Sequence, residues 1–250
     1  YPQGQLFADI IGYVNTEHSG QAGIEYSQEG ILERNLEDLN LKSMMRVKKD
    51  GSGAIIPTSL PEGIIKLDDL QLQLTLDLRL QRAARDALKA QVKEFNAKRG
   101  TVIVMDVHNG EIVALANEPT YDPNRYFLYD FALYKNWAVT DSYEPGSTFK
   151  PVHVAIALDE GVINPNSRVL DSPSTVIDGW PIANASKTGK GWVSITQAMD
   201  DSSNTAMIHI VKKMSRLKYY ERMLGLGVNR LMGIDLPFEA TGYLKPKNIF

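Results

Sequence analysis

Apolar and polar residues alternate with a period of two over residues 70–76. Four leucines, at positions 70, 72, 74 and 76, are separated by Gln71, Gln73 and Thr75. A period of two is typical of a strand that buries one face, because successive side chains point to opposite sides of the sheet. The pattern predicts a half-buried strand over 70–76.

After this segment the apolar residues recur every three or four positions. They are Leu80, Ala84, Leu88, Val92 and Phe95. This spacing places the apolar residues on one face of a helix. Asp77 stands where an N-cap is expected, and Gly100 is a suitable end. We therefore expect one amphipathic helix between Asp77 and Gly100, with its apolar face in the core.

The next segment, "TVIVMDVHNGEIVALAN", holds two β-branched runs around Asn109-Gly110. Asn-Gly is favoured where a tight hairpin turn needs two residues with positive φ, so the segment predicts a β-hairpin. Beyond "YDPN" the pattern predicts mainly helices and loops, with helices over 148–160, 194–200, 204–214 and 217–224. The expected fold class is α+β.

Composition narrows the classes of function. The 250 residues carry a net charge of −3 with no basic cluster, which argues against nucleic-acid binding. There is no cysteine, which excludes disulfides and thiolate metal sites. His18, His108, His153 and His209 lack metal-ligand spacing, so no metal or cofactor is assigned. No apolar run approaches the roughly 18 residues of a membrane span, and the start at Tyr1 leads us to expect a fragment.

The stretch "DSYEPGSTFKPVHVAIALDEG" carries the sharpest chemical signal. Pro145 and Gly146 break the chain, and an apolar helical face follows, so Ser147 is expected at a helix N-terminus. Lys150 lies one turn away on the same face, where its amine can approach the serine hydroxyl. A neutral lysine can activate serine as a nucleophile, provided that burial or a nearby cation lowers its pKa. The N-terminal N–H groups of the helix would favour a developing oxyanion.

Ser202-Ser203-Asn204 falls between two predicted helices. Taken alone it predicts a helix cap. As a partner of Ser147 and Lys150 it could supply a hydroxyl that relays a proton and an amide that holds the lysine. Ser-x-x-Lys combined with such a second motif is typical of β-lactamases and penicillin-binding proteins.

With "YEPGSTFKP", "NWAVTD" and "SSN", the chain resembles the transpeptidase domain of class B penicillin-binding proteins, and Glu144 favours their division-type, FtsI-like branch. The resemblance extends over nearly the whole chain. It implies a serine β-lactamase-like α+β transpeptidase domain, truncated at its C-terminus, over residues 65–250. Residues 1–64, with "YPQGQLFADIIGYV" and "GQAGIE", would be the C-terminal part of an irregular pedestal domain.

The resemblance implies a serine-type D,D-transpeptidase that cross-links peptidoglycan. In that reaction a stem peptide ending in D-Ala-D-Ala acylates Ser147, and a second stem peptide resolves the ester by aminolysis. Lys150 would be the general base, Ser202 the proton relay and Asn204 a contact to Lys150 and to the substrate amide. β-Lactam antibiotics would acylate the same serine. The family further implies a membrane anchor upstream, a periplasmic catalytic domain, and a division glycosyltransferase and other divisome proteins as partners.

A Lys-Thr-Gly at Lys187-Thr188-Gly189 matches the third motif of the family, but it precedes Ser202. Its surroundings, "ANASKTGKGW", predict a polar loop. We therefore expect the third motif beyond Phe250, and we expect residues 1–250 alone to be inactive because one oxyanion donor would be missing.

Four other functions stay open at this point. A class D β-lactamase can share the Ser-Thr-Phe-Lys motif, although Asn204 and the long segment before Ser147 argue against it. A β-lactam sensor would acylate without turnover. An elongation-type transpeptidase would share the chemistry but not the septal role, and a division scaffold would have lost its activity despite retaining these residues.

Overall fold

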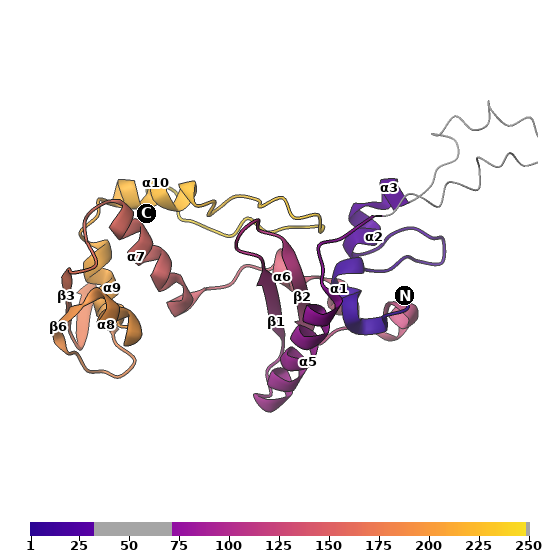
Figure 1. Ribbon diagram of the computed structural model, residues 1–250, viewed down its shortest axis with the longest axis horizontal. Coiled ribbons are helices and arrows are strands. Elements are labelled where there is room, and N and C mark those ends of the chain that lie inside the picture. The colour runs from indigo at the N-terminus through magenta and orange to yellow at the C-terminus, as the bar shows by residue number, and fades with distance from the viewer. Residues whose placement is uncertain (33–71, 249–250) are drawn as a thin grey trace, which may run out of the picture. The chain divides into compact units, whose positions relative to one another are not determined.

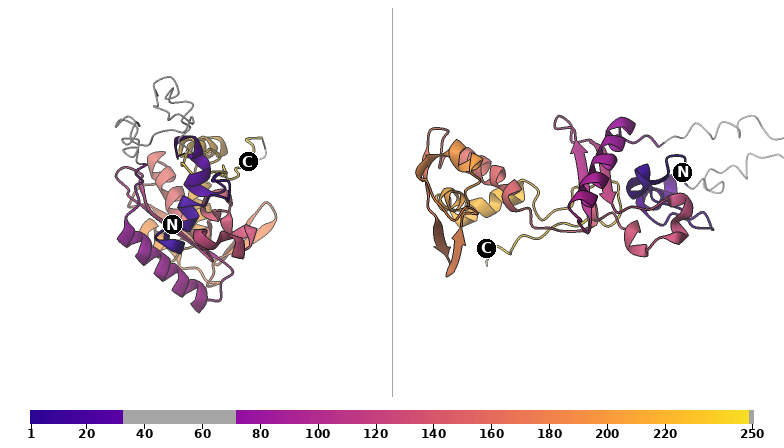
Figure 2. Two further views of the ribbon diagram at one scale, coloured as in Figure 1. Left: turned by 90° about the vertical axis from the view of Figure 1, so that its right-hand side faces the viewer. Right: turned by 90° about the horizontal axis from the view of Figure 1, so that it is seen from below.

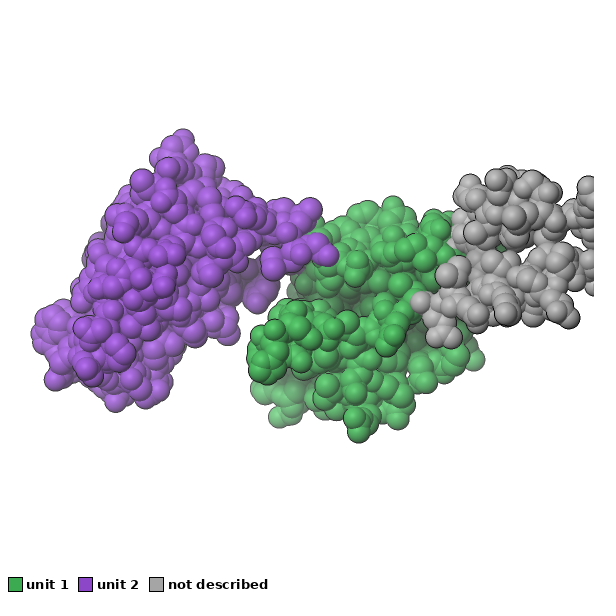
Figure 3. Space-filling view, turned by 45° about the horizontal axis from the view of Figure 1, so that its top comes forward, with its two compact units in different colours: residues 1–140, 234–239 green, residues 141–233, 240–250 purple. Residues whose placement is uncertain are grey.

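The computed structural model describes residues 1–32 and 72–248, which form two compact units (Figure 3). Unit 1 contains residues 1–140 and 234–239, and unit 2 contains residues 141–233 and 240–250. The predicted boundary at residue 64/65 lies outside the described residues. The mixture of helices and strands in both units confirms the predicted α+β class.

Unit 1 is built on a helix packed against a hairpin (Figure 1). The helix α5 (Leu78–Glu94) lies along the antiparallel pair β1 (Gly100–Met105) and β2 (Ile112–Glu118). The other elements that the described residues of unit 1 form are short: η1 (Gly4–Phe7), α1 (Ala8–Ile11), α2 (Gly23–Ser27), α3 (Glu29–Leu32), η4 (Pro123–Leu128), η5 (Phe131–Tyr134) and α6 (Trp137–Thr140).

The helix α5 confirms the predicted element and its cap. The Asp77 carboxylate accepts the backbone N–H groups of Arg79 at 2.8 Å and Leu80 at 2.9 Å, which satisfies two of the free donors at the helix start. The buried face is the predicted one only in part: Ala84 and Leu88 are buried as expected, but Phe95 is exposed. Leu80 is 45% exposed, whereas Gln81 and Arg85 are buried because their polar groups bond to backbone carbonyls of unit 1.

The segment 72–76 is not a strand, so that prediction was wrong for the described residues. Leu74 and Leu76 still pack against a core cluster. Two bonds tie this segment to the beginning of β2: Thr75 Oγ1 donates to the Ile112 carbonyl at 2.6 Å, and Asp77 N to the Val113 carbonyl at 2.9 Å. The alternation correctly predicted the partial burial of Leu74 and Leu76 but not that Leu72 is exposed, and the described residues of this segment form no strand.

The predicted hairpin is confirmed, with a longer connection than expected. The register pairs Gly100 with Glu118 and shifts near Met105, and six residues join the strands. Gly110 has a φ of +80°, but Asn109 does not enter the left-handed region. The Asn109 side chain instead accepts the Glu111 N–H at 2.9 Å, which closes the turn by another route.

Unit 2 packs helices against two antiparallel strand pairs (Figures 1 and 2). Its helical elements are η6 (Gly146–Phe149), α7 (Lys150–Asp159), α8 (Ile195–Asp200), α9 (Asn204–Val211) and α10 (Arg216–Gly225), so all four predicted helices are confirmed. The strands β3 (Arg168–Asp171) and β6 (Gly191–Ser194) pair antiparallel, as do β4 (Ser174–Ile177) and β5 (Trp180–Ala183). None of these four strands was predicted.

The core of unit 2 lies where α7 and α9 pack against each other and α9 covers β3. Its buried members include Ile156, Val169, Val193, Ala206 and Ile210. Because α7 and α9 share this core, the residues at their N-termini are brought together. These N-termini carry Lys150 and Asn204.

Candidate active site

Ser147 is displayed on a tight turn that leads into α7. Gly146 opens the turn η6 with a φ of +59°, and a Cβ there would meet no atom within 4 Å, so conformation alone accounts for the glycine. Thr148 closes the turn from its side chain, which donates to the Pro145 carbonyl at 2.6 Å. The Ser147 side chain is exposed, so it is accessible from solvent.

Lys150 is the first residue of α7, and only 8% of it is exposed. Its ammonium nitrogen has three acceptors from one turn. They are the Ser202 carbonyl at 2.5 Å, Ser202 Oγ at 2.9 Å and Asn204 Oδ1 at 2.7 Å. A lysine has three N–H donors, so this set satisfies it completely.

The turn between α8 and α9 supplies these acceptors. Ser202 has a φ of +49°, a conformation that costs a residue with a Cβ roughly 1–2 kcal/mol. This backbone aims both the carbonyl and the hydroxyl of Ser202 at Lys150. The Asn204 amide donates to the Ala183 carbonyl at 2.9 Å, which leaves its Oδ1 facing Lys150.

The structure therefore brings together three of the four predicted site residues: Lys150, Ser202 and Asn204. Ser147 lies one turn before Lys150 in the same helical segment, but within the described residues no hydrogen bond joins its hydroxyl to the lysine amine. The predicted contact between Ser147 and Lys150 is not made in this structure. In a free enzyme such contacts are often long, and they tighten when substrate binds.

The electrostatics favour a lysine that can lose its proton. Burial lowers the pKa of Lys150 because it removes water from the charged form. His153, one turn further along α7, has its pKa lowered by burial and then by the charge of Lys150, so it is not a second cation at neutral pH. Its Nδ1 lies 2.6 Å from the Tyr219 hydroxyl.

Lys187, Thr188 and Gly189 lie in the connection between β5 and β6, which confirms the predicted polar loop. Lys187 has a φ of +56°, which no strand residue adopts. The loop is held by the Thr188 carbonyl, which accepts the Asn184 side-chain amide at 2.8 Å. The Lys187 side chain is exposed and is not among the partners of Lys150.

Sequence reasoning missed the buried polar residues that carry the 202–204 turn, above all Asp171 and Asn184. A signal for Asn184 was present in Asp178-Gly179. Both residues have positive φ and form the two-residue turn between β4 and β5. A hairpin closed there pairs 174 with 183 and brings Asn184 beside Pro173, as the 3.2 Å bond from Asn184 N to the Pro173 carbonyl shows.

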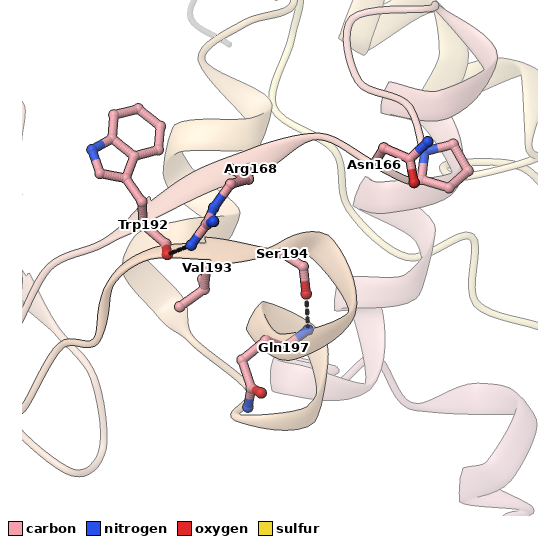
Figure 4. Close-up of a pocket in the computed structure, with 7 residues that line it drawn as sticks. Asn166, Arg168, Trp192, Val193, Ser194 and Gln197 are labelled. Carbon is pink, nitrogen blue, oxygen red and sulfur yellow. Dashed lines mark hydrogen bonds between the residues drawn. The ribbon is translucent and has the colours of Figure 1, made fainter.

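A separate pocket of about 520 Å³ lies on the paired strands β3 and β6 and the beginning of α8 (Figure 4). Arg168 crosses it and donates to the Trp192 carbonyl, and Ser194 accepts the Gln197 N–H at 3.1 Å. None of the four predicted site residues lines this pocket. Among the described residues, no group of three or more His, Asp or Glu side chains could hold a metal ion, and no helix is long and apolar enough to span a membrane.

Comparison with known proteins gives the family. The model of the penicillin binding protein transpeptidase domain matches residues 100–250, more than half of the chain. The peptidoglycan D,D-transpeptidase FtsI homolog of Mesostigma viride is 42% identical over 255 residues, 98% of this chain and 42% of the relative. The probable peptidoglycan D,D-transpeptidase PenA of Neisseria meningitidis is 34% identical over 246 residues, 98% of this chain and 41% of the relative.

The fold has solved counterparts. Penicillin-binding protein 3 of Mycobacterium tuberculosis, solved in complex with aztreonam, superposes with a TM-score of 0.79 over 100% of this chain and 51% of that chain, at 21% identity. The chain spans about two fifths of the length of the curated relatives above. The matched family model and the identity to both relatives show that the chain belongs to the penicillin-binding protein transpeptidase family.

Proposed function

We propose that the protein is a serine D,D-transpeptidase that cross-links peptidoglycan, with Ser147 as nucleophile, Lys150 as general base, Ser202 as proton relay and Asn204 as the amide that holds the lysine and the substrate. The observation that carries the proposal is the set of three acceptors around the buried Lys150 amine. The names of the curated relatives supply the reaction class.

The donor and acceptor inventory explains the role of Ser202. When Lys150 is neutral it keeps two N–H groups and gains one lone pair. The Ser202 carbonyl and Asn204 Oδ1, as oriented here, can only accept, so they take the two N–H groups. The Ser202 hydroxyl is the one partner of the three that can donate to the lone pair. A proton can thus pass to Lys150 through Ser202, without a direct bond from Ser147.

The reaction follows from these positions. Ser147 Oγ attacks the carbonyl of the penultimate D-alanine, its proton passes to Lys150, and the C–N bond breaks as the terminal D-alanine leaves with a proton. The amine of a second stem peptide then attacks the ester, which forms the cross-link and restores the serine hydroxyl. The Ser147 N–H lies in the first turn of η6, where N–H groups lack helical partners and can bind the oxyanion. A β-lactam carbonyl would acylate the same oxygen.

The FtsI name of the Mesostigma viride relative supports a role in septal wall synthesis, with a division glycosyltransferase and other division proteins as partners. Because peptidoglycan lies outside the plasma membrane, the catalytic domain would act on the extracytoplasmic face. An elongation role remains the alternative within the same chemistry.

Assays with a stem pentapeptide and with nitrocefin distinguish a transpeptidase from a β-lactamase. The full-length protein, incubated with a synthetic stem pentapeptide and an acceptor amine, should release D-alanine and form the new amide in equal amounts, and mass spectrometry measures both. Nitrocefin should be consumed once per protein molecule and then stop. Sustained nitrocefin turnover without amide formation would overturn the proposal in favour of a β-lactamase. Labelling without amide formation would indicate a sensor or an inactive scaffold.

A further inference from the structure

A buried polar cluster lies beneath the 202–204 turn, and the mechanism above does not use it. Its members come from β3, the end of β5 and the beginning of α9. Their exposed fractions are 4% for Asp171, 7% for Asn184, 2% for Ser203 and 0% for Thr205. None of them bonds to Lys150. Burying a polar group costs free energy unless the group is hydrogen-bonded, so the bonds that these four side chains make call for an explanation.

Asp171 is the centre of the cluster. Its Oδ1 accepts from Ser203 Oγ at 2.6 Å, from Asn184 Nδ2 at 2.7 Å and from Thr205 Oγ1 at 3.2 Å. Its Oδ2 accepts the backbone N–H of Lys190 at 2.9 Å. Burial pushes the pKa of this carboxyl upward, but these four bonds outweigh burial and hold the pKa below its usual value. The carboxylate is therefore charged at neutral pH and only accepts.

Asn184 connects this carboxylate to the active-site turn. Its Nδ2 donates to Asp171, which leaves its Oδ1 free to accept the backbone N–H groups of Asn204 at 2.9 Å and Thr205 at 3.2 Å. These are among the first N–H groups of α9, which have no partner inside the helix. The amide thus fixes the backbone of Asn204 at the point where its side chain turns toward Lys150.

Ser203 makes the second connection. It donates to Asp171, and the same oxygen caps α9 by accepting the Ala206 N–H at 3.0 Å. Ser203 separates the two residues that contact Lys150, so fixing it fixes the direction of both neighbours. The negative charge of Asp171 beside the N-terminus of α9 adds a favourable interaction with the helix dipole.

We propose that Asp171 is a positioning residue for acylation, which acts through Ser203 and Asn184 to hold Ser202 and Asn204 against Lys150. This inference rests on the proposed function, because it requires Lys150 to act as the base. Asp171 does not touch the reacting atoms. Its loss would let the turn relax, and an error of about 1 Å in such a group can cost about a hundredfold in rate.

The test compares acylation by a fluorescent penicillin in full-length wild type, Asp171→Ala and Val169→Ala. Val169 is two residues earlier on β3 and 1% exposed, but it belongs to the apolar core, so its truncation destabilises the same strand without touching the cluster. At a temperature where circular dichroism shows all three proteins folded, we expect Asp171→Ala to lower the saturating acylation rate about ten- to a hundredfold. We expect Val169→Ala to leave that rate within about twofold of wild type.

Coupling to Asn204 distinguishes positioning from general destabilisation. In an Asn204→Ala background the loss caused by Asp171→Ala should shrink to less than about a third of its size in wild type, because its main target is gone. If Asp171→Ala does not fold, Asp171→Asn takes its place. That variant keeps the size but puts a donor where the carboxylate only accepts, and it should show an intermediate loss of the saturating rate.

Two results would overturn the inference: a saturating rate for the folded Asp171 variant equal to that of Val169→Ala, or losses that multiply fully in the double variant. Both leave the proposed function intact. Failure of the proposed function has another signature, namely wild-type protein that does not acylate, or acylation that persists in Ser147→Ala.

Discussion

At the scale of the residue, the central feature is a buried lysine whose three hydrogen-bond acceptors among the described residues include no carboxylate. The three acceptors of Lys150 are a carbonyl, a hydroxyl and an amide oxygen, none of which carries a charge. A carboxylate in their place would stabilise the ammonium and raise the lysine pKa, whereas burial among neutral acceptors lowers it. The site therefore favours release of a proton, as a general base requires.

Lys150→Arg tests this requirement. Arginine keeps the charge and the donors but does not lose a proton at accessible pH. We expect acylation by fluorescent penicillin to fall by about 10²–10⁴-fold, the usual contribution of a general base. The matched control is Lys187→Arg in the exposed Lys-Thr-Gly loop, which should acylate at the wild-type rate. A comparable loss of acylation in Lys187→Arg would indicate that the Lys187 loop is part of the active site.

The pH dependence of acylation has a fixed sign. Lysine acts as a base only when neutral, and the neutral fraction increases as pH rises through the pKa. Because burial lowers the pKa of Lys150 from 10.5, the rising limb of the rate should have its midpoint below that value. Stopped-flow acylation across pH measures the limb. A rate that falls as pH rises through the neutral range would contradict the assignment of Lys150.

At the scale of the element, periodic patterns predicted the helices and the hairpin that are determined by the residues of a single segment. The helix α5, the β1–β2 hairpin and the four helices of unit 2 follow from apolar spacing and caps in single segments. The pattern over residues 72–76 predicted the half-buried Leu74 and Leu76, but it did not predict that Leu72 is exposed or that the described segment forms no strand. Strand pairing depends on distant residues, so the β3–β6 pair, whose strands are separated by the β4–β5 hairpin, left no local periodic signal.

The site divides in the same way. The residues of Ser-x-x-Lys and Ser-Ser-Asn could be predicted because reacting groups recur at short spacings. Asp171 and Asn184 were missed, since their role depends on two strand pairs, β3–β6 and β4–β5, that bring them under α9. The Asp178-Gly179 turn signalled the β4–β5 hairpin but not this role. An aspartate or asparagine at positions 171 and 184 indicates no role until the pairing of the strands beside them is known. The bonding of Lys150 to Ser202 in place of Ser147 likewise arises from packing of α7 on α9.

The backbone of Gly12 lies very close to that of Ala22 in unit 1, and a substitution of Gly12 tests whether this contact matters for stability. A Cβ on Gly12 would lie 1.7 Å from the Ala22 carbonyl oxygen, whereas a Cβ on Gly4 meets nothing within 4 Å. Both glycines have positive φ, so alanine is strained at either position. At Gly12 the backbone, with φ +80° and ψ −149°, lies in a region almost confined to glycine, which adds on the order of 1–3 kcal/mol of strain. Gly12→Ala should therefore destabilise by about 1–3 kcal/mol more than Gly4→Ala in urea unfolding. Equal losses would show that this contact does not constrain the fold.

At the scale of the whole molecule, each unit has its own core, and unit 1 is built from segments distant in sequence. Asp9 of α1 and Arg85 of α5 form a buried ion pair, and their side chains are 2% and 7% exposed. Asp9 also accepts the Asn117 N–H at 3.1 Å and the Thr120 hydroxyl at 3.0 Å, and Arg85 donates to the Asn117 carbonyl at 2.6 Å. The first helices of the chain are thus part of the same unit as the β1–β2 hairpin.

Asp9→Ala would leave the Arg85 charge buried without its partner. Removing one member of a buried pair typically costs about 3–5 kcal/mol, so the free energy of unfolding should fall by that amount. Chemical denaturation monitored by circular dichroism measures it. Arg79→Ala, which breaks the exposed pair with Asp77, is the control and should change stability little. A small loss for Asp9→Ala would mean that the N-terminal segment contributes little to unit 1.

The most direct measurement of the central claim is the site of covalent penicillin attachment. Full-length protein is labelled with penicillin, digested, and the modified peptide is sequenced by mass spectrometry, in wild type, Ser147→Ala and Ser142→Ala. Ser142 is an exposed serine five residues earlier on the same segment. We expect one adduct per molecule, on Ser147, which is lost in Ser147→Ala and kept in Ser142→Ala. An adduct on another residue, or undiminished labelling of Ser147→Ala, would contradict it.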